Sequence, residues 1–196
     1  MRREFHVRFC EGVGVRFPRA TRPILVCRRS ATQALEAFEA IALRMGLTIN
    51  REKTRITKLT AGFDFIGYQF VKRRSPTNGK MIIYIFPSKH AQRNIRRQIK
   101  SFTKRRAPIT PAEFVKQVNE TVRGWVNYYR HTNASEAFRA LQRFINIRFR
   151  RYLNCRSKGR GFGWKKYPNA TLYAQGIIYI GSGVIRYGRE PAHAVR

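Results

Sequence analysis

The sequence predicts an α+β fold, with a helix and short antiparallel strands in its first part and a bundle of three helices in its second. Apolar residues make up 43% and aromatic residues 13% of the 196 residues, enough to form a hydrophobic core. Apolar residues alternate in segments between residues 54 and 86, which is the period of a strand. From residue 88 they recur every three or four positions, which is the period of a helix.

The first strands and helix follow from local patterns. Residues 1–23 mix glycine, proline and arginine without a period, so we expect them to be irregular or poorly ordered. The apolar run ILVC (24–27) predicts a short strand. Residues 31–45 predict a helix that ends at Gly46. One face of this helix is apolar and comprises Ala34, Phe38, Ile41 and Met45.

A hairpin is expected next. The segment REKTRITKL (51–59) alternates apolar and polar residues and predicts a strand or sheet edge. Residues 63–73 predict a single strand that is apolar on both faces. The pair Asn78-Gly79 is a hairpin signal, and MIIYIF (81–86) predicts the returning strand.

The helix that begins near Ser88 has a cationic face and no acidic residue. At 100° per residue its basic side chains fall within about 100° of arc. A solvated face usually mixes charges of both signs, so contact with phosphate is favoured over plain solvation. The basic face comprises Arg93, Arg96, Arg97, Lys100 and Lys104, and the opposite face Ala91, Ile95, Ile99 and Phe102.

Two further helices complete the predicted bundle. Thr110-Pro111-Ala112-Glu113 is a capping box with proline at the first helical position. A cap at Asn133 or Ser135 begins the third helix. The predicted inward residues are Phe114, Val118, Val122, Trp125 and Tyr129 on the second helix and Phe138, Leu141, Ile145 and Leu153 on the third. The predicted outward residues are Lys116, Asn119, Arg123, Asn127 and Arg130, then Arg139, Arg143 and Arg150. Of those on the third helix, Arg139 and Arg143 are predicted to bind RNA.

The stretch RGWVNYYRH (123–131) divides between these two faces. Trp125 and Tyr129 belong to the packed side, whereas the polar side chains belong to the exposed side and are predicted to contact RNA. Tyr128 and His131 lie near the border and are not assigned. The predicted contacts are Arg123, Asn127 and Arg130.

The segment RSKGRGFGWKKYPNA (156–170) interleaves aromatic residues with cations. Such loops stack on unpaired bases, although the rings could equally dock on the bundle. A short closing hairpin is expected around residues 181–183. The cations assigned to RNA binding in this loop are Lys158, Arg160, Lys165 and Lys166.

The charge balance points to a polyanion. Forty-one lysines and arginines face ten acidic residues, giving a net charge of +31, and neutralised phosphates release counterions. No apolar run approaches the roughly 20 residues that span a bilayer, so no membrane is expected. The start of the chain lacks the apolar core of a signal peptide, and the three cysteines show no zinc or disulfide spacing, so a cytoplasmic location is expected. Asp64 is the only aspartate, and the sequence predicts no catalytic residue, metal site or cofactor.

The order of three phrases resembles a known family. GLTINREKTRI (46–56), FDFIGYQF (63–70) and TVRGWVNYYRHTNASEAF (121–138) together are similar to the C-terminal part of a group II intron-encoded reverse transcriptase/maturase, from about residue 24 to 187. The resemblance implies that residues 24–87 are the end of the palm, and that residues 88–155 are the thumb or maturase domain X. Domain X would bind intron RNA or another structured RNA, with DNA as an alternative partner, and would assist splicing that the RNA itself performs. A primer-grip-like strand is implied at Phe65, Ile66, Gly67 and Tyr68.

One departure from the family bears on activity. A Tyr-Ala-Asp-Asp turn would precede the strand ILVC, but this chain reads PRATRP (18–23) there. We therefore expect no polymerase activity from this chain alone, and magnesium would belong to the intron RNA or to the missing polymerase site. Three alternatives stay open: RNA-directed DNA polymerase activity in a fuller or complemented form, a general basic RNA-binding scaffold, and an inactive product of a disrupted gene. The sequence does not predict the oligomeric state.

Overall fold

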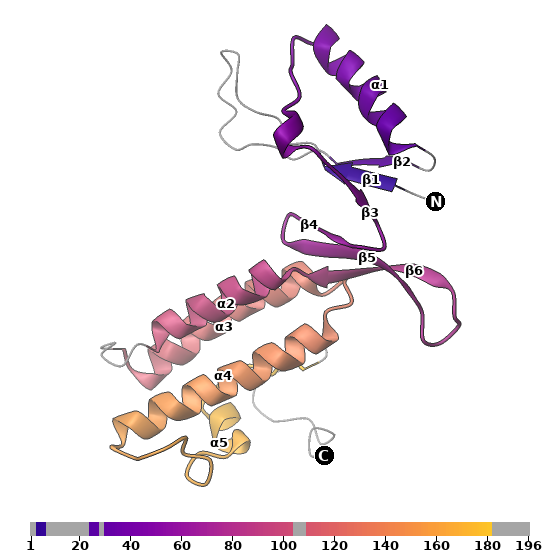
Figure 1. Cartoon of the computed structure of the whole chain (residues 1–196). Coiled ribbons are helices and arrows are strands. Elements are labelled where there is room, and N and C mark those ends of the chain that lie inside the picture. Colours follow the sequence, from indigo (N-terminus) through magenta and orange to yellow (C-terminus); the bar gives the residue numbers. More distant parts are fainter. Residues whose placement is uncertain (1–2, 7–23, 28–29, 104–108, 182–196) are drawn as a thin grey trace. The chain divides into compact units, whose positions relative to one another are not determined.

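The computed structural model describes residues 3–6, 24–27, 30–103 and 109–181, and it has an α+β fold (Figure 1). The chain divides into two compact units. The N-terminal unit comprises residues 1–65 and 70–84, and the C-terminal unit comprises residues 66–69 and 85–196. Among the described residues, no helix is both long and apolar enough to cross a membrane.

A three-stranded antiparallel sheet lies in the N-terminal unit. Its strands are β1 (Arg3–His6), β2 (Ile24–Cys27) and β3 (Arg55–Lys58), in the order β2-β1-β3. The strands predicted at residues 24–27 and within 51–59 are confirmed. The prediction that residues 1–23 are irregular is wrong for residues 3–6, because β1 pairs with both neighbours and forms the middle of the sheet. Residues 7–23 lie outside the described part.

Helix α1 (Ala31–Arg44) follows β2 and confirms the predicted helix. The amide of Leu47 donates to the carbonyl of Ala42 over 2.9 Å, and Gly46, at φ +73°, ends the helix as predicted. The predicted apolar face is only half right, because Ile41 and Met45 are 46% and 69% exposed. The face that packs instead centres on Ala31 and includes Ala34, Leu35 and Phe38.

The segment predicted as one strand over 63–73 is two strands. Strand β4 (Phe63–Phe65) ends at a turn formed by Ile66 and Gly67, and β5 (Tyr68–Arg74) returns beside it. The φ values of Ile66 and Gly67 are +47° and +82°, the sign that a type I′ hairpin turn requires at both positions. The turn at Asn78-Gly79 is confirmed, and it leads into β6 (Met81–Pro87).

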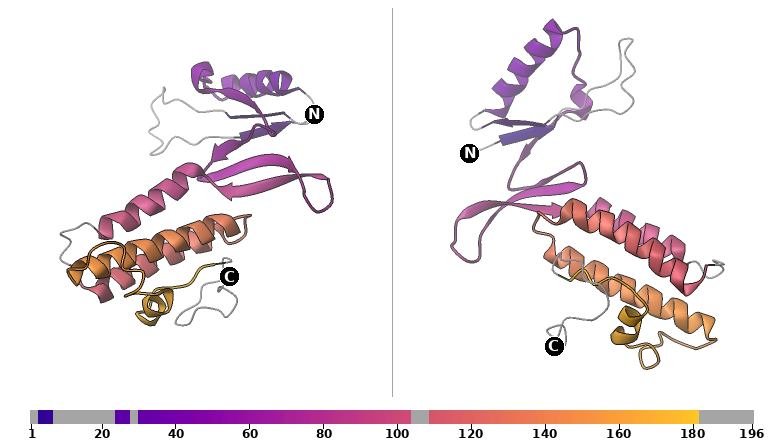
Figure 2. Two further views of the ribbon diagram at one scale, coloured as in Figure 1. Left: turned by 60° about the horizontal axis from the view of Figure 1, so that its bottom comes forward. Right: turned by 180° about the vertical axis from the view of Figure 1, so that it is seen from behind.

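Three helices of the C-terminal unit lie side by side (Figure 2). They are α2 (Lys89–Phe102), α3 (Pro111–Tyr129) and α4 (Ser135–Arg156), and a short helix α5 (Asn169–Ala174) packs on α4. The sequence did not predict α5. The rings of Phe114 and Phe149 stack between α3 and α4 with centroids 4.9 Å apart. Other fully buried side chains of this core are Ile99, Val118, Val122, Val126, Ile145, Leu172, Ile177, Ile178 and Ile180.

The starts of α2 and α3 agree with the sequence, whereas that of α4 does not. Ser88 caps α2, and Thr110 and Glu113 form the predicted capping box of α3. The predicted cap at Asn133 or Ser135 is wrong, because the N-cap of α4 is Ala134 and no side chain caps it. Asn133 instead exchanges two hydrogen bonds with the backbone of Ile85 at the end of β6, over 2.8 and 3.1 Å.

Helix α4 is buried on two faces. One face packs into the apolar core. The other is a row of polar side chains four residues apart, which hydrogen-bonds to the segment that follows the helix. The prediction that Arg150 points outward is therefore wrong, since Arg150 is 1% exposed. The predicted closing hairpin lies partly outside the described residues. Its first half is buried in the core, with the amide of Ile180 donating to Oε1 of Gln142 over 2.8 Å. The polar row comprises Gln142, Asn146, Arg150 and Asn154.

Candidate nucleic-acid interface

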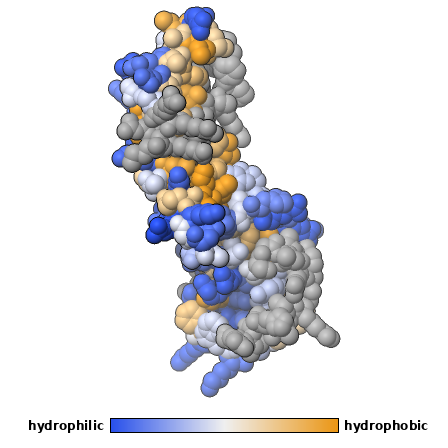
Figure 3. Space-filling view, turned by 90° about the vertical axis from the view of Figure 1, so that its right-hand side faces the viewer, coloured by the Kyte–Doolittle hydropathy of each residue, from blue (hydrophilic) through white to orange (hydrophobic). Residues whose placement is uncertain are grey.

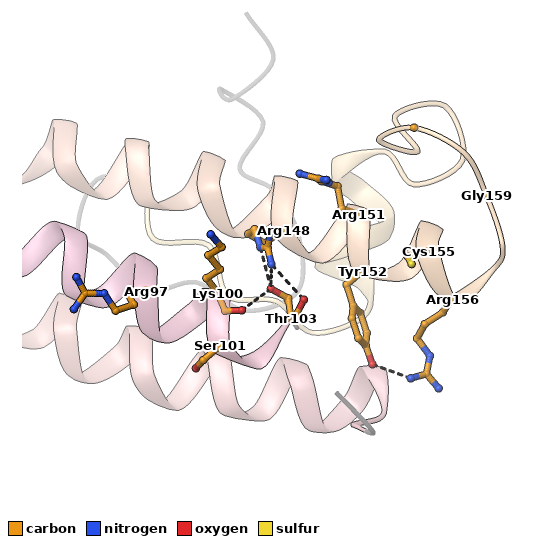
Figure 4. A pocket seen from close by; sticks show the side chains of 11 residues that line it. Arg97, Lys100, Ser101, Thr103, Arg148, Arg151, Tyr152, Cys155, Arg156 and Gly159 are labelled. Carbon is orange, nitrogen blue, oxygen red and sulfur yellow. Dashed lines mark hydrogen bonds between the residues drawn. The ribbon is translucent and has the colours of Figure 1, made fainter. Parts of the chain in front are cut away.

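A cationic groove of about 860 Å³ lies between the C-terminal halves of α2 and α4 (Figure 4). None of its lining residues is acidic. Helix α2 contributes two cations, helix α4 contributes three, and the loop after α4 closes one end with Gly159 and Gly161. A groove lined only by positive charges concentrates positive potential and attracts a polyanion. The five cations are Arg97, Lys100, Arg148, Arg151 and Arg156.

Two of these cations also hold the groove together. The Nε of Arg148 donates to the hydroxyl of Thr103 over 2.9 Å, and this contact fixes α4 to the end of α2. Burial, and to a smaller extent the nearby charge of Arg151, lowers the pKa of Arg148. The Nη1 of Arg156 donates to the carbonyl of Ile109 over 2.9 Å and to the hydroxyl of Tyr152 over 3.1 Å. These two arginines are therefore committed to shaping the wall of the groove.

The other three cations are exposed and available to a ligand. The side chains of Arg97 and Lys100 project from α2 (Figure 4), and they make no hydrogen bond or ion pair with another described residue. The guanidinium of Arg151 lies 5.0 Å from the centroid of the Phe162 ring. Arg97, Lys100 and Arg151 thus offer three positive charges that phosphate groups can neutralise.

The other described helical residues predicted to contact RNA or to face outward do not line the groove. On α2, Arg93 is exposed and Arg96 is half-buried, while Lys104 lies outside the described residues. The predicted outward position of Asn119 is wrong, because its side chain accepts from the amide of Ile178 and donates to the carbonyl of Gly176. The exposed positions on α3 and α4 are as predicted for Lys116, Arg123, Asn127, Arg130, Arg139 and Arg143.

The end of α3 holds the hairpin turn that the sequence analysis described as primer-grip-like. The hydroxyls of Tyr128 and Tyr129 donate to the carbonyls of Ile66 and Gly67, each over 3.0 Å. The hydroxyl of Tyr68 in turn donates to the backbone carbonyl of Tyr128 over 2.9 Å. Tyr128, unassigned from the sequence, is thus a clamp for the turn, and the packed position predicted for Tyr129 is confirmed.

These contacts affect the titration of the tyrosines and the accessibility of the turn. Burial raises the pKa of Tyr129 to about 12, and burial together with the neighbouring side chain of Tyr128 raises the pKa of Tyr68 to about 12. Phe65 and Gly67 are half-buried, whereas Ile66 is 68% exposed at the tip. The four residues therefore form a turn rather than the continuous strand that the resemblance implied.

The loop of residues 157–168 wraps around the end of α4. The Nδ2 of Asn154 donates to the carbonyls of Arg160 and Gly161, each over 3.1 Å. A Cβ on Gly163 would lie 2.9 Å from the Cβ of Asn154, so the loop approaches the helix as closely as glycine allows. Its predicted RNA-binding cations, Lys158, Arg160, Lys165 and Lys166, are all exposed.

Sequence reasoning missed the α4 side of the groove. Arg148, Arg151, Tyr152, Cys155 and Arg156 follow the three- and four-residue spacing of one helix face. That spacing is visible in RFRRYLNCR (148–156), and it could have identified this face of α4. Among the described residues, no group of three or more histidines, cysteines or acidic residues could hold a metal ion.

Residues 92–170 match the model of the family described as "Group II intron, maturase-specific domain". All residues that line the groove fall within this segment. A search of curated proteins found no match for the chain.

Proposed function

Because residues 92–170 form a group II intron maturase-specific domain, we propose that this chain binds the structured RNA of a group II intron and assists its splicing. The observation that carries this proposal is the cationic groove between α2 and α4. The groove lies within the matched segment, has no acidic residue in its lining, and presents exposed cations on a well-packed helical core.

The role requires no catalytic residue in the protein. In this family the intron RNA performs the transesterification, so the protein contributes by binding and stabilising the folded RNA. Helices α2–α4 would then act as the thumb, or domain X, and the turn at residues 66–67 would correspond to the primer grip. Both assignments rest on the resemblance of the sequence.

The role of the groove in RNA binding can be tested by removing its three exposed charges together. The variant Arg97→Gln/Lys100→Gln/Arg151→Gln should weaken binding to a group II intron RNA. It should also reduce the slope of log K against log salt by about 2–3, because about three fewer counterions are released. The matched control removes three exposed charges from the N-terminal unit, and comprises Arg55→Gln, Lys58→Gln and Arg73→Gln. Equal losses in the two variants would show that net charge, and not the groove, determines binding.

Recognition of the intron is tested with a second RNA. At about 150 mM salt the chain should bind the folded intron more tightly than an unstructured RNA of the same length, because non-specific attraction is weakened by salt. Filter binding measures both affinities. Equal affinities would reduce the proposal to non-specific electrostatic binding, as expected of a general basic scaffold.

We further propose that the chain alone does not synthesise DNA, because PRATRP occupies the place expected for the Tyr-Ala-Asp-Asp turn. Primer extension on an RNA template with magnesium or manganese should yield no product. Product made by the purified chain would contradict this proposal without affecting the one on RNA binding.

A further inference from the structure

The loop of residues 157–168 exposes two of its three aromatic rings. Tyr167 packs partly against the helical core, as the docking alternative expected. Phe162 and Trp164 are 49% and 56% exposed, which is unusual for rings of this size on a loop that is otherwise well anchored. An exposed tryptophan in a fixed position needs an explanation that packing alone does not supply.

Trp164 rests on a buried cation. The guanidinium carbon of Arg150 lies 3.9 Å from the centroid of the indole ring. Arg150 is itself held by the carbonyl of Tyr167, 2.7 Å from its Nε, and by Oδ1 of Asn169, 2.6 Å from its Nη2. The inner face of the indole is thus covered by a stationary group. The 56% of its surface that stays exposed must lie on the outer face and the edges.

The loop is ordered before any ligand arrives. Asn154, 4% exposed, binds two loop carbonyls, and the amide of Tyr167 donates to the carbonyl of Gly163 over 2.9 Å. A side chain at Gly159 would collide with the amide of Asn154. A ring held in this way loses little conformational entropy on binding, so most of the stacking free energy contributes to affinity.

The surroundings of Trp164 select the partner. Four cations are exposed on the same loop, and no acidic residue occurs from residue 156 to residue 181. A flat apolar face among cations complements a flat base that carries a negatively charged backbone. The cations are Lys158, Arg160, Lys165 and Lys166.

The geometry points to Trp164 as a stacking platform for an unpaired base of the bound RNA, with the loop cations contacting the flanking phosphates. This inference rests on the proposed function, and it adds that the chain prefers RNA with unpaired nucleotides at this place to a continuous duplex. A base paired inside a continuous helix cannot stack on the indole, because both of its faces are covered by neighbouring base pairs.

Fluorescence can test stacking directly, because the chain contains only two tryptophans. The variant Trp125→Phe leaves Trp164 as the sole reporter. A single-stranded RNA of about 12 nucleotides should quench its emission strongly, whereas a blunt duplex of the same sequence should bind with little quenching. Binding of the single strand without quenching would overturn the inference while leaving RNA binding intact. Failure of the unmodified chain to bind any RNA would instead overturn the proposed function, and the inference with it.

Affinity gives an independent test. Trp164→Ala should weaken binding of the single strand about 5- to 150-fold, because stacking of one base contributes about 1–3 kcal/mol, and it should leave duplex binding unchanged. Trp164→Phe should retain most of the affinity, and circular dichroism checks that both variants are folded. An equal loss for single strand and duplex, or no loss, would overturn the inference. So would quenching by vesicles of anionic phospholipid in the absence of quenching by RNA, since the platform would then be a membrane contact.

Discussion

In the C-terminal unit Phe114, Phe138 and Phe149 are at most 2% exposed, whereas in the N-terminal unit Leu43 and Met45 of α1 are 71% and 69% exposed. Figure 3 shows the same contrast on one face of the molecule, where apolar surface lies over the N-terminal unit. Most of the other large exposed apolar side chains also belong to that unit. They are Ile41, Leu47, Ile56, Met81, Ile82 and Ile83.

The difference teaches that periodic apolar residues are not sufficient for a core. Both units contain amphipathic helices, but only α2, α3 and α4 cover one another, and α4 is covered again by the C-terminal segment. In the N-terminal unit, the described core around Ala31 includes no other fully buried side chain. The proposed RNA-binding groove lies on the unit that has its own core, which fixes the positions of its cations.

The largest expected effect comes from truncating a buried ring of the C-terminal unit, compared with truncating an exposed leucine of α1 in the N-terminal unit. Phe149→Ala should lower the free energy of unfolding of the C-terminal unit by about 3–5 kcal/mol, because it leaves a cavity between α3 and α4. Leu43→Ala in the N-terminal unit should change stability by less than about 0.5 kcal/mol. Urea unfolding followed by circular dichroism measures both variants, and tryptophan fluorescence separately reports the C-terminal unit, which holds both tryptophans. Similar losses in the two variants would abolish the contrast between the units.

A smaller loss is expected when the buried cation beneath Trp164 is removed. Arg150→Met should lower the stability of the C-terminal unit by about 1–3 kcal/mol, because the carbonyl of Tyr167 and Oδ1 of Asn169 lose their donor. The neighbouring Arg151→Met is the matched control, since Arg151 is exposed and should change stability by less than about 0.5 kcal/mol. If Arg150→Met were neutral, the polar row of α4 would not contribute to the rigidity that distinguishes this unit.

The tyrosine clamp should make the stability of the C-terminal unit fall at high pH. The pKa of Tyr129 is raised to about 12, from 10.0, so between these values an unfolded tyrosine loses its proton while the folded one keeps it. The unfolded state then binds fewer protons, and the free energy of unfolding declines as pH rises from about 10 to about 12. Tyr129→Phe should flatten this decline. It should also cost about 1 kcal/mol at neutral pH through the lost hydrogen bond to Gly67. An unchanged pH profile in the variant would show that Tyr129 does not cause the decline.

Much of the helical unit could be predicted because its signals are local. The capping box at Thr110 fixed the start of α3, and the spacing from Phe114 to Tyr129 identified its packed face. Arg97 and Lys100 were correctly placed on the exposed face of α2, and they line the groove. These features depend only on residues within one helix, where period and geometry are tightly linked.

The errors occurred where a partner distant in sequence decides the conformation. Gln142, Asn146, Arg150 and Asn154 follow the helical period but are polar, and a polar row is usually solvated. They are buried because the segment after residue 156 supplies hydrogen-bond partners, as Tyr167 does for Arg150. Likewise β1 was missed because its partners lie some 20 and 50 residues away, and a strand gains its hydrogen bonds only from such partners.

The turn at Ile66 was missed for the same reason. It also allows the most sensitive test of the contrast between the two units. Residues 63–73 were predicted to be one strand from their alternation, and a β-branched residue at φ +47° is strained. The strain is tolerated because Tyr128 and Tyr129, both from α3, bind the carbonyls of the turn. Ile66→Gly removes the strain and loses little packing, since Ile66 is 68% exposed.

Ile66→Gly should therefore stabilise the C-terminal unit by about 0.5–1 kcal/mol, after the greater flexibility of glycine in the unfolded chain is subtracted. The matched control is Gly67→Ala, which should destabilise it, because φ is +82° and the new Cβ would lie 2.7 Å from the hydroxyl of Tyr129. Urea unfolding by tryptophan fluorescence measures both variants. A loss of stability in Ile66→Gly would mean that the isoleucine side chain contributes a contact that outweighs its strain, and that the turn is fixed from both sides.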